Sequence, residues 1–284
     1  MRLLVTGAAG QLGRDVVLHA HENNDDVLAL AHADLDVTDR SAVLSAVTSF
    51  APDVVINGAA WTAVDACEAD PARAYLHNAL AVRWLVEGCH RVGAHLVHVS
   101  TDYVFDGTKS EPYHEWDATA PMSVYGASKL GGETEALAAG PGACVVRTSW
   151  VCGEHGNNMV KTILRLAGER DRLQFVDDQI GFPSFTTDLA PALRRIGLDR
   201  LSGIAHVTNS GAVTWCEFAR EVLRASGQDP ARVHPITTAE LQPPRPAKRP
   251  SNSRLDNSVL RAAGYRDMAD FREPLARLVG RLIA

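Results

Sequence analysis

Short apolar runs alternate along the chain with longer stretches whose apolar residues recur every three or four positions. The short runs predict β-strands at 2–6, 27–31, 54–56, 95–99 and 143–147. The longer stretches predict helices at 11 to about 23, 39–50, about 71–92 and across 122–138. Strands that alternate with helices of ~10–15 residues indicate βαβ units and a parallel sheet. Because the strands are apolar throughout, we expect helices on both faces of that sheet.

The length of 284 residues leaves room for a second, smaller unit. We predict a nucleotide-binding domain over 1–150, with part of 176–210 returning to it, and mainly a substrate lobe over 151–284. The Pro- and Arg-rich stretch 242–250 reads as a loop.

Composition narrows the class of protein. Hydrophobic residues at 46% and charged residues at 22% exclude a disordered chain, and a net charge of −6 argues against a general nucleic-acid binder. No apolar run is long enough to span a membrane, and the N-terminus lacks the layout of a signal peptide, so we expect a cytoplasmic protein with no membrane partner. Of the 28 basic residues only four are lysines, namely Lys109, Lys129, Lys161 and Lys248.

Cysteine and histidine give no metal or disulfide signal. The five cysteines are widely spaced with no C-x-x-C pair, which predicts reduced thiols. His95 and His98 lie three apart in a predicted strand, so their side chains should point to opposite faces of the sheet. No metal site is predicted.

A glycine loop follows the first predicted strand. Gly7, Gly10 and Gly13 stand at the strand-to-helix turn, where glycine permits a sharp turn and a close approach of phosphate. The helix N-terminus then offers free N–H groups to an anion. This layout predicts a Rossmann-type, doubly wound α/β fold that binds NADPH or NADH.

The choice between the two cofactors stays open. The selector that reads the adenosine ribose normally ends the second strand, but Ala31 and His32 stand there. Asp36 follows shortly, and both an adenine contact and a helix-capping role are open to it. Thr38 or Asp39 fits the cap position.

The candidate catalytic residues are Thr101, Tyr125 and Lys129. Tyr125 and Lys129 are four apart in a predicted helix and share one face. We expect the ammonium to lower the pKa of the phenol and so to suit it to acid–base work. Thr101 ends the fourth strand at the ligand-binding edge of the sheet, where its hydroxyl can reach the same substrate oxygen.

With these residues the chain resembles the extended short-chain dehydrogenase/reductases, and within them the dTDP-4-dehydrorhamnose reductase family. The stretches that carry this resemblance span most of the chain: GQLG (10–13), NGAAWTAVDACEAD (57–70), STDYVFDG (100–107), VYGASKLGGE (124–133), RTSWV (147–151), VDDQIGFPS (176–184) and RPSNSRLD (249–256). The resemblance implies NAD(P)H-dependent reduction of the C4 ketone of a dTDP-4-keto-6-deoxyhexose, most simply dTDP-4-dehydro-L-rhamnose.

The resemblance also implies roles for individual residues. Tyr125 would donate the proton, assisted by Lys129 and Thr101. Cofactor contacts would come from Gly7, Gly10, Gln11, Leu12, Gly13, Asp36, Val37, Ala59, Ala60, Trp61, Thr62, Tyr125 and Lys129. Substrate contacts would come from Thr101, Asp102, Tyr103, Trp150, Asn158 and Arg249. Some family members hold a magnesium ion at a dimer contact, but we see no complete ligand set for Mg²⁺ here, and a homodimer stays open.

Some residues depart from the family pattern or have a second explanation. Cys152, Ser184 and Trp61 replace the usual Tyr, Thr and Tyr or His, and Cys152 and Trp61 are candidates to line the site. Trp150 is either a wall against the deoxysugar or a core residue. The basic residues near the C-terminal end of the chain suit a diphosphate or form a solvated loop: Arg245, Lys248, Arg249 and Arg254.

Three other functions stay open beside this reductase. A related dTDP-4-keto-6-deoxysugar is one alternative substrate, with natural-product biosynthesis as its setting. A nucleotide-sugar epimerase with tightly bound NAD and a non-catalytic regulatory subunit are the others. Dehydration is disfavoured, because the related dehydratases carry Asp-Glu after the catalytic Thr, and this chain has Asp102-Tyr103.

Overall fold

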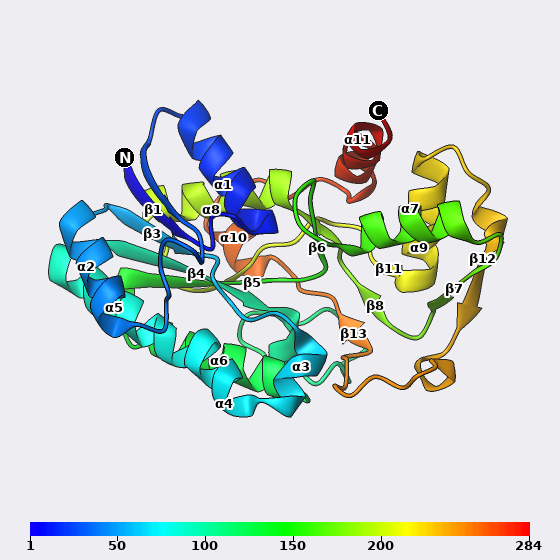
Figure 1. Cartoon of the computed structure of the whole chain (residues 1–284), viewed down its shortest axis with the longest axis horizontal. Helices are drawn as coiled ribbons and strands as arrows, with labels where there is room; N and C mark the ends of the chain where they lie inside the picture. The colour runs from blue at the N-terminus through cyan, green and yellow to red at the C-terminus, as the bar shows by residue number, and fades with distance from the viewer.

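The computed structural model describes all 284 residues. A six-stranded, wholly parallel sheet forms the larger part of the molecule, in the order β10-β5-β4-β3-β1-β2 (Figure 1). Its strands are β1 (Arg2–Thr6), β2 (Asp26–Leu30), β3 (Val54–Asn57), β4 (His95–Thr101), β5 (Ala143–Thr148) and β10 (Gly203–His206). The doubly wound α/β prediction is confirmed.

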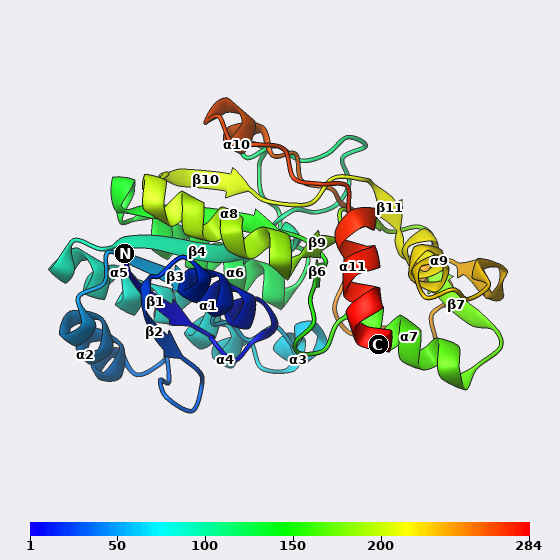
Figure 2. The same ribbon diagram turned by 90° about the horizontal axis from the view of Figure 1, so that it is seen from above.

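Helices cover both faces of this sheet (Figure 2). One face carries α1 (Gln11–Glu22), α8 (Thr186–Asp199) and the short α10 (Ser258–Ala262). The other carries α2 (Arg40–Phe50), α5 (Ala81–Val92) and α6 (Val124–Leu137). The strands are therefore buried from both sides, which explains their continuous apolar runs.

The helices begin and end where local chemistry favours it. Asp39 caps α2 by accepting hydrogen bonds from the backbone N–H groups of Ser41 and Ala42. Ser123 caps α6 in the same way, and α5 ends at Gly93 with φ of +73°. The stretch predicted as one helix at 71–92 consists of α4 (Pro71–Tyr75), a π-helical turn η1 (Leu76–Leu80) and α5. The short helix α3 (Val64–Ala69) precedes it.

A smaller group of elements lies beside the carboxyl ends of the large sheet (Figures 1 and 2). Its helices are α7 (Met159–Glu169), α9 (Trp215–Ala225) and α11 (Arg272–Ile283). Its short strands are β6 (Val151–Cys152), β7 (Leu173–Val176), β8 (Ile180–Gly181), β9 (Ser184–Phe185), β11 (Val213–Thr214), β12 (Val233–Ile236) and β13 (Asn252–Ser253). Single turns complete the chain at η2 (Asp102–Val104), η3 (Gly140–Gly142), η4 (Pro230–Arg232) and η5 (Thr238–Glu240). These elements enclose an apolar core of their own around Phe185, Phe218 and Phe271.

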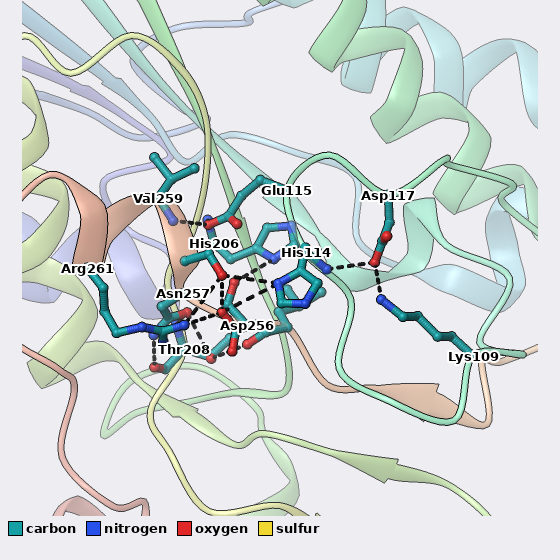
Figure 3. A network of polar contacts seen from close by, with 12 residues as sticks. Lys109, His114, Glu115, Asp117, His206, Thr208, Asp256, Asn257, Val259 and Arg261 are labelled. Atoms are coloured by element: carbon teal, nitrogen blue, oxygen red, sulfur yellow. Dashed lines mark hydrogen bonds and ion pairs between the residues drawn. The ribbon is translucent and has the colours of Figure 1, made fainter.

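The chain returns to the large sheet through α8 and β10 before its C-terminal segment. A polar network fixes this return (Figure 3). The Glu115 carboxylate accepts hydrogen bonds from the backbone N–H groups of His206 and Val259 at 3.1 and 3.0 Å. Asp256 pairs with Arg261 and lies 3.6 Å from His114. The 249–256 motif therefore has a structural role, because its last residue, Asp256, helps to hold the C-terminal segment against the large sheet.

No helix is long and apolar enough to cross a membrane. All five cysteines are buried free thiols, as predicted.

Candidate active site

A cavity of about 620 Å³ opens at the carboxyl ends of β1, β3, β4 and β5, the edge at which ligands bind in doubly wound sheets. Its size is typical of a small-molecule site. Among the predicted site residues, the cavity is lined by Gly10, Gln11, Leu12, Ala60, Thr62, Thr101, Asp102, Tyr103, Tyr125, Lys129 and Trp150. The structure therefore brings the glycine loop, the catalytic triplet and the substrate candidates to one place.

The glycine loop fits a pyrophosphate group. Gly7 has φ of +67°, and a Cβ at Gly13 would lie only 2.2 Å from the Gly7 carbonyl oxygen. No side chain caps the first turn of α1, and no acidic residue stands in it. The free N–H groups and the positive end of the helix dipole are thus available to an anion.

A second hollow of about 270 Å³ shares Gly10 and Ala60 with the first. The predicted contacts Gly7, Val37 and Ala59 line it. Its apolar lining residues suit the adenine end of a dinucleotide. The two hollows together therefore offer a continuous path for such a cofactor.

The carboxylates that follow β2 are both engaged in turns. Asp36 accepts hydrogen bonds from the Thr38 backbone N–H at 2.9 Å and hydroxyl at 2.7 Å, which lower its pKa. Asp34 accepts one from the Ala31 N–H at 2.9 Å. Asp36 does not line either hollow, whereas His32 and His77 line the second. Neither Asp34 nor Asp36 therefore lines the second hollow.

The Trp61 ring does not line the cavity, in contrast to the expectation from the sequence. Its ring packs near His77 and beneath the Arg73 guanidinium, 4.6 Å from the ring centroid. Its backbone is fixed by Asn78, which accepts from the Trp61 N–H at 2.8 Å and donates to the Trp61 carbonyl at 3.1 Å. This backbone anchor places Ala60 and Thr62, rather than the indole, at the cavity wall.

Helix α6 presents Tyr125 and Lys129 to the cavity, and both are buried. The Tyr103 ring packs edge-on against the Tyr125 ring, with centroids 5.5 Å apart. Thr101 ends β4, donates to the Asp102 carboxylate at 3.0 Å and lines the same cavity as Tyr125. The three predicted catalytic residues thus meet at one point of the cavity.

The pKa of Tyr125 differs from the expectation. Burial raises the pKa of the phenol, the Asp102 charge adds to this rise, and the nearby Thr101 hydroxyl opposes it. The prediction of a lowered pKa is wrong because it weighed a neighbouring ammonium and left out the loss of solvation. A raised pKa keeps Tyr125 protonated at neutral pH, the state that a proton donor requires.

Lys129 is held by the backbone and by neighbours on β4 and α6. Its Nζ donates to the Val99 carbonyl oxygen at 2.7 Å and lies 3.5 Å from His98 Nε2. Burial lowers the pKa of Lys129 to about 8, and the Glu133 charge opposes this. Glu133 is itself neutralised by a buried ion pair with Arg147 at 2.7 Å.

The substrate side of the cavity carries an unusual carboxylate and a strained tryptophan. Asp102 is buried, one of its carboxylate oxygens has no partner, and burial raises its pKa to about 6. Trp150 has φ of +48° and lines the cavity while also packing on the second apolar core. Trp150 is therefore a core residue that also lines the cavity, and its role as a wall against the sugar stays a prediction.

Three substrate-side candidates are engaged elsewhere. Asn158 caps α7 and donates to the side chain of Gln11 at 2.7 Å. Arg249 makes a bidentate ion pair with Asp65, at 2.8 and 2.7 Å, which ties the 242–250 loop to α3. The Cys152 thiol is buried against the Trp150 carbonyl and does not line the cavity.

The basic residues of 245–254 were expected to gather their positive charge near the site, and only some of them lie close together. Arg254 turns away to the carbonyl of Ser110 and the side chain of Asn252. Arg245 lies near Arg249 and Tyr103, and burial lowers its pKa. No group of three or more His, Cys, Asp or Glu side chains is placed to hold a metal ion.

Several lining residues are absent from the sequence-based prediction: Gly58, Val64, Val99, Ser100, Thr148, Ser149, Val151, Gly156, Asn157 and Trp215. Some directly follow the strand ends that the prediction used, and position alone could have found them. Trp215, at the start of α9, reaches the cavity only through the tertiary fold.

The doubly wound sheet, the glycine loop and the buried Thr-Tyr-Lys set define an oxidoreductase of the extended short-chain dehydrogenase/reductase class. The family model "RmlD substrate binding domain" matches residues 1–283. The chain belongs to this family, that of the dTDP-4-dehydrorhamnose reductases.

Relatives and solved structures agree with this assignment. The chain is 45% identical to a "Probable dTDP-4,6-dihydroxy-2-methyloxan-3-one 4-ketoreductase" of Streptomyces antibioticus, covering 97% of this chain and 93% of the relative. It is 44% identical to a dTDP-4-dehydrorhamnose reductase of Streptomyces griseus, covering 96% and 91%. A crystal structure of the Bacillus anthracis dTDP-4-dehydrorhamnose reductase in complex with NADP superposes with a TM-score of 0.94, at 36% identity and 99% coverage of both chains.

Proposed function

We propose that this enzyme uses NAD(P)H to reduce the C4 ketone of a dTDP-4-keto-6-deoxyhexose, with dTDP-4-dehydro-L-rhamnose as substrate and dTDP-L-rhamnose as product. The observation that carries the proposal is the meeting of Thr101, Tyr125 and Lys129 in a cavity continuous with the glycine loop. Full-length similarity to reductases of such sugars supports it.

The cofactor, when bound, supplies a hydride to the carbonyl carbon. Tyr125 donates its phenolic proton to the carbonyl oxygen, and the Thr101 hydroxyl stabilises the charge that develops there. Lys129 holds the ribose next to the nicotinamide and supports Tyr125 electrostatically. The raised pKa of Tyr125 suits it to act as the acid in this direction of the reaction.

The first turn of α1 and the hollow that Val37 and Ala59 line would hold the cofactor. His32 lines the second hollow, whereas Asp34 and Asp36 do not line it and are held in turns. This arrangement is compatible with NADPH and with NADH.

The sugar would lie between Tyr125 and the Trp150 wall, with Asp102 and Tyr103 beside it. The free Asp102 oxygen can accept a hydrogen bond from a sugar hydroxyl. Arg245 stands near Tyr103 and suits the diphosphate, while the neighbouring Arg249 is paired with Asp65. We assign cofactor binding to residues 1–150 together with the returning part of 176–210. Substrate binding falls mainly to the remaining lobe.

A different keto-sugar is the second candidate, because the relative from Streptomyces antibioticus is named for another dTDP-linked 4-keto sugar. The product's stereochemistry depends on which face of the ketone meets the nicotinamide, and related reductases of one fold can differ in this.

The test is oxidation of NADPH and of NADH with dTDP-4-keto-6-deoxyglucose, with and without a 3,5-epimerase, followed by NMR of the product. Turnover that requires the epimerase and yields the L-rhamno product supports the proposal. Turnover without the epimerase indicates the second candidate. Stoichiometric NAD on the purified protein, with no net oxidation of added NADPH, would indicate an epimerase instead.

A further inference from the structure

A buried chain of polar side chains leads from the first strand to the catalytic lysine. Thr6 ends β1, Asn57 ends β3 and His98 lies in β4, and all three are almost fully buried. The Thr6 hydroxyl donates to Asn57 Oδ1 at 2.6 Å, and Asn57 Nδ2 lies 2.9 Å from His98 Nδ1. His98 Nε2 then lies 3.5 Å from Lys129 Nζ.

The orientation of the Asn57 amide is fixed by a group that can only donate. The backbone N–H of Ala59 points at Asn57 Oδ1 at 3.2 Å, so an oxygen must stand there. The amide nitrogen therefore faces His98, and it too can only donate.

This arrangement decides the tautomer of His98. Burial and the neighbouring Lys129 lower the pKa of His98 well below its ordinary value, so the ring is neutral. Because Nδ1 accepts from Asn57, the single ring proton resides on Nε2. The Nε2–H group then faces Lys129. Its N–H dipole repels the ammonium form of Lys129, whereas it can donate a hydrogen bond to the lone pair of the neutral amine.

The other polar groups near Lys129 are a backbone carbonyl, two carboxylates and a phenol. The Val99 carbonyl accepts one hydrogen bond from Nζ, and Glu133, one turn along α6, is already paired with Arg147 and Ser100. Tyr125 stands one turn earlier on α6 and is protonated, and the Asp102 carboxylate acts mainly on the two tyrosines beside it.

We propose that His98, locked by Asn57 in the Nε2–H tautomer, is a positioning residue that destabilises the Lys129 ammonium beside the catalytic tyrosine. This rests on the proposed function, in which Tyr125 gives its proton to the carbonyl oxygen and Lys129 supports it electrostatically. His98 would thereby set the pH range over which Lys129 carries its charge during turnover.

Two substitutions at Asn57 separate the effect of the His98 tautomer on the pKa of Lys129 from the effect of burial on that pKa. Asn57→Asp keeps an acceptor for Thr6 and Ala59 and places an acceptor opposite His98, which moves the ring proton to Nδ1. Nε2 then becomes an acceptor for the Lys129 ammonium. Asn57→Ala removes the donor without adding charge. His95→Gln is the matched control, because His95 is a buried histidine of the same strand that faces Leu201 instead.

The experiment is NMR on the full-length protein, with ¹⁵N-labelled histidine to read the tautomer and ¹³Cε-labelled lysine to titrate Lys129. Only four lysines give signals, and the loss of one in Lys129→Arg assigns it. The wild type should show a protonated Nε2 and a Lys129 that titrates near pH 8. In Asn57→Asp the proton should reside on Nδ1 and the Lys129 midpoint should rise by about one pH unit or more.

Asn57→Ala should raise the Lys129 midpoint in the same direction, and His95→Gln should leave it unchanged. The basic limb of the pH profile of kcat/KM should move with the midpoint. A wild-type His98 protonated on Nδ1, or a Lys129 midpoint that neither Asn57 variant raises, would overturn the inference. Because the NMR readouts need no turnover, they are distinguishable from a failure of the sugar-nucleotide assay.

Discussion

The Trp150 indole lies flat against the Trp215 indole, with ring centroids 3.5 Å apart and ring planes inclined by 10°. Trp150 follows β5 and Trp215 opens α9, so the stack joins the large sheet to the smaller lobe across the cavity that both rings line. Gly181 makes room for it, because a Cβ there would lie 2.6 Å from the Trp150 ring.

Replacing Trp215 with Ala should weaken substrate binding more than it slows chemistry. The loss of stacking, worth roughly 0.5–1.5 kcal/mol, releases Trp150 from its position against the sugar. We expect KM for the sugar nucleotide to rise about two- to tenfold, with a smaller change in kcat and an unchanged KM for NADPH. Steady-state kinetics with each substrate varied in turn measure this.

Trp215→Phe is the control, since it keeps an aromatic face for Trp150 and should restore most of the affinity. An Ala variant in which KM for NADPH rises as much as that for the sugar would show that Trp215 supports the cavity generally.

The sequence predicted five of the six strands of the large sheet, because each is a short apolar run covered from both sides. The sixth, β10, was expected only as part of a segment that returns to the sheet. Thr101 was expected to end the fourth strand, and it does so by pairing with Thr148 in β5. The π-helical turn inside the predicted helix at 71–92 has no marker in the apolar pattern.

Some residues of the candidate site belong to local sequence motifs, and others reach it only through the tertiary fold. The glycine loop and the Tyr125–Lys129 pair are contiguous patterns, and the structure brings both to one cavity. Trp215 and His98 act through neighbours that are distant in sequence, so no local pattern marks them. The pKa of Tyr125 was predicted with the wrong sign because burial cannot be read from a spacing.

Gly13→Ala should destabilise the protein and weaken cofactor binding. The added methyl group would lie 2.2 Å from the Gly7 carbonyl oxygen, so either the loop or α1 has to move. Overpacking of this kind costs about 1–3 kcal/mol. Chemical denaturation and equilibrium binding of NADPH measure the two effects. Gly168→Ala is the matched control, because Gly168 lies in α7 with open space at its Cβ position. There, alanine should be neutral or stabilise the helix by up to about 1 kcal/mol. Equal losses in both variants would contradict the close-packing argument.

Tyr125→Phe should lower kcat by about 10²–10⁴-fold, the usual contribution of a positioned general acid. The ring still packs against Tyr103, so the dissociation constant for NADPH should change little. Single-turnover rates and fluorescence titration with NADPH measure the two quantities. Tyr113→Phe removes a phenolic hydroxyl that bonds to Asp106 instead and should leave kcat unchanged. A Tyr125→Phe variant with wild-type turnover would exclude Tyr125 as the proton donor.

Asp102→Asn should stabilise the protein at neutral pH while it impairs turnover. Burial raises the pKa of Asp102 from 3.8 to about 6, so between these values the unfolded chain ionises while the folded protein keeps the proton. The wild type therefore loses stability as the pH rises from about 4 to about 6, by about 3 kcal/mol in total. Asparagine does not titrate and avoids this loss.

The gain in unfolding free energy of Asp102→Asn should thus be largest above about pH 6 and vanish below about pH 4, as urea denaturation across this range would show. Asp106→Asn should behave oppositely, because hydrogen bonds from Tyr113 and Thr108 lower the pKa of Asp106 and stabilise the folded protein when that carboxylate is charged. The loss in Asp106→Asn should fade as the pH falls through the lowered pKa. An Asp102→Asn gain that did not depend on pH would mean that the substitution acts through packing, and that the buried carboxylate is not the source of the instability.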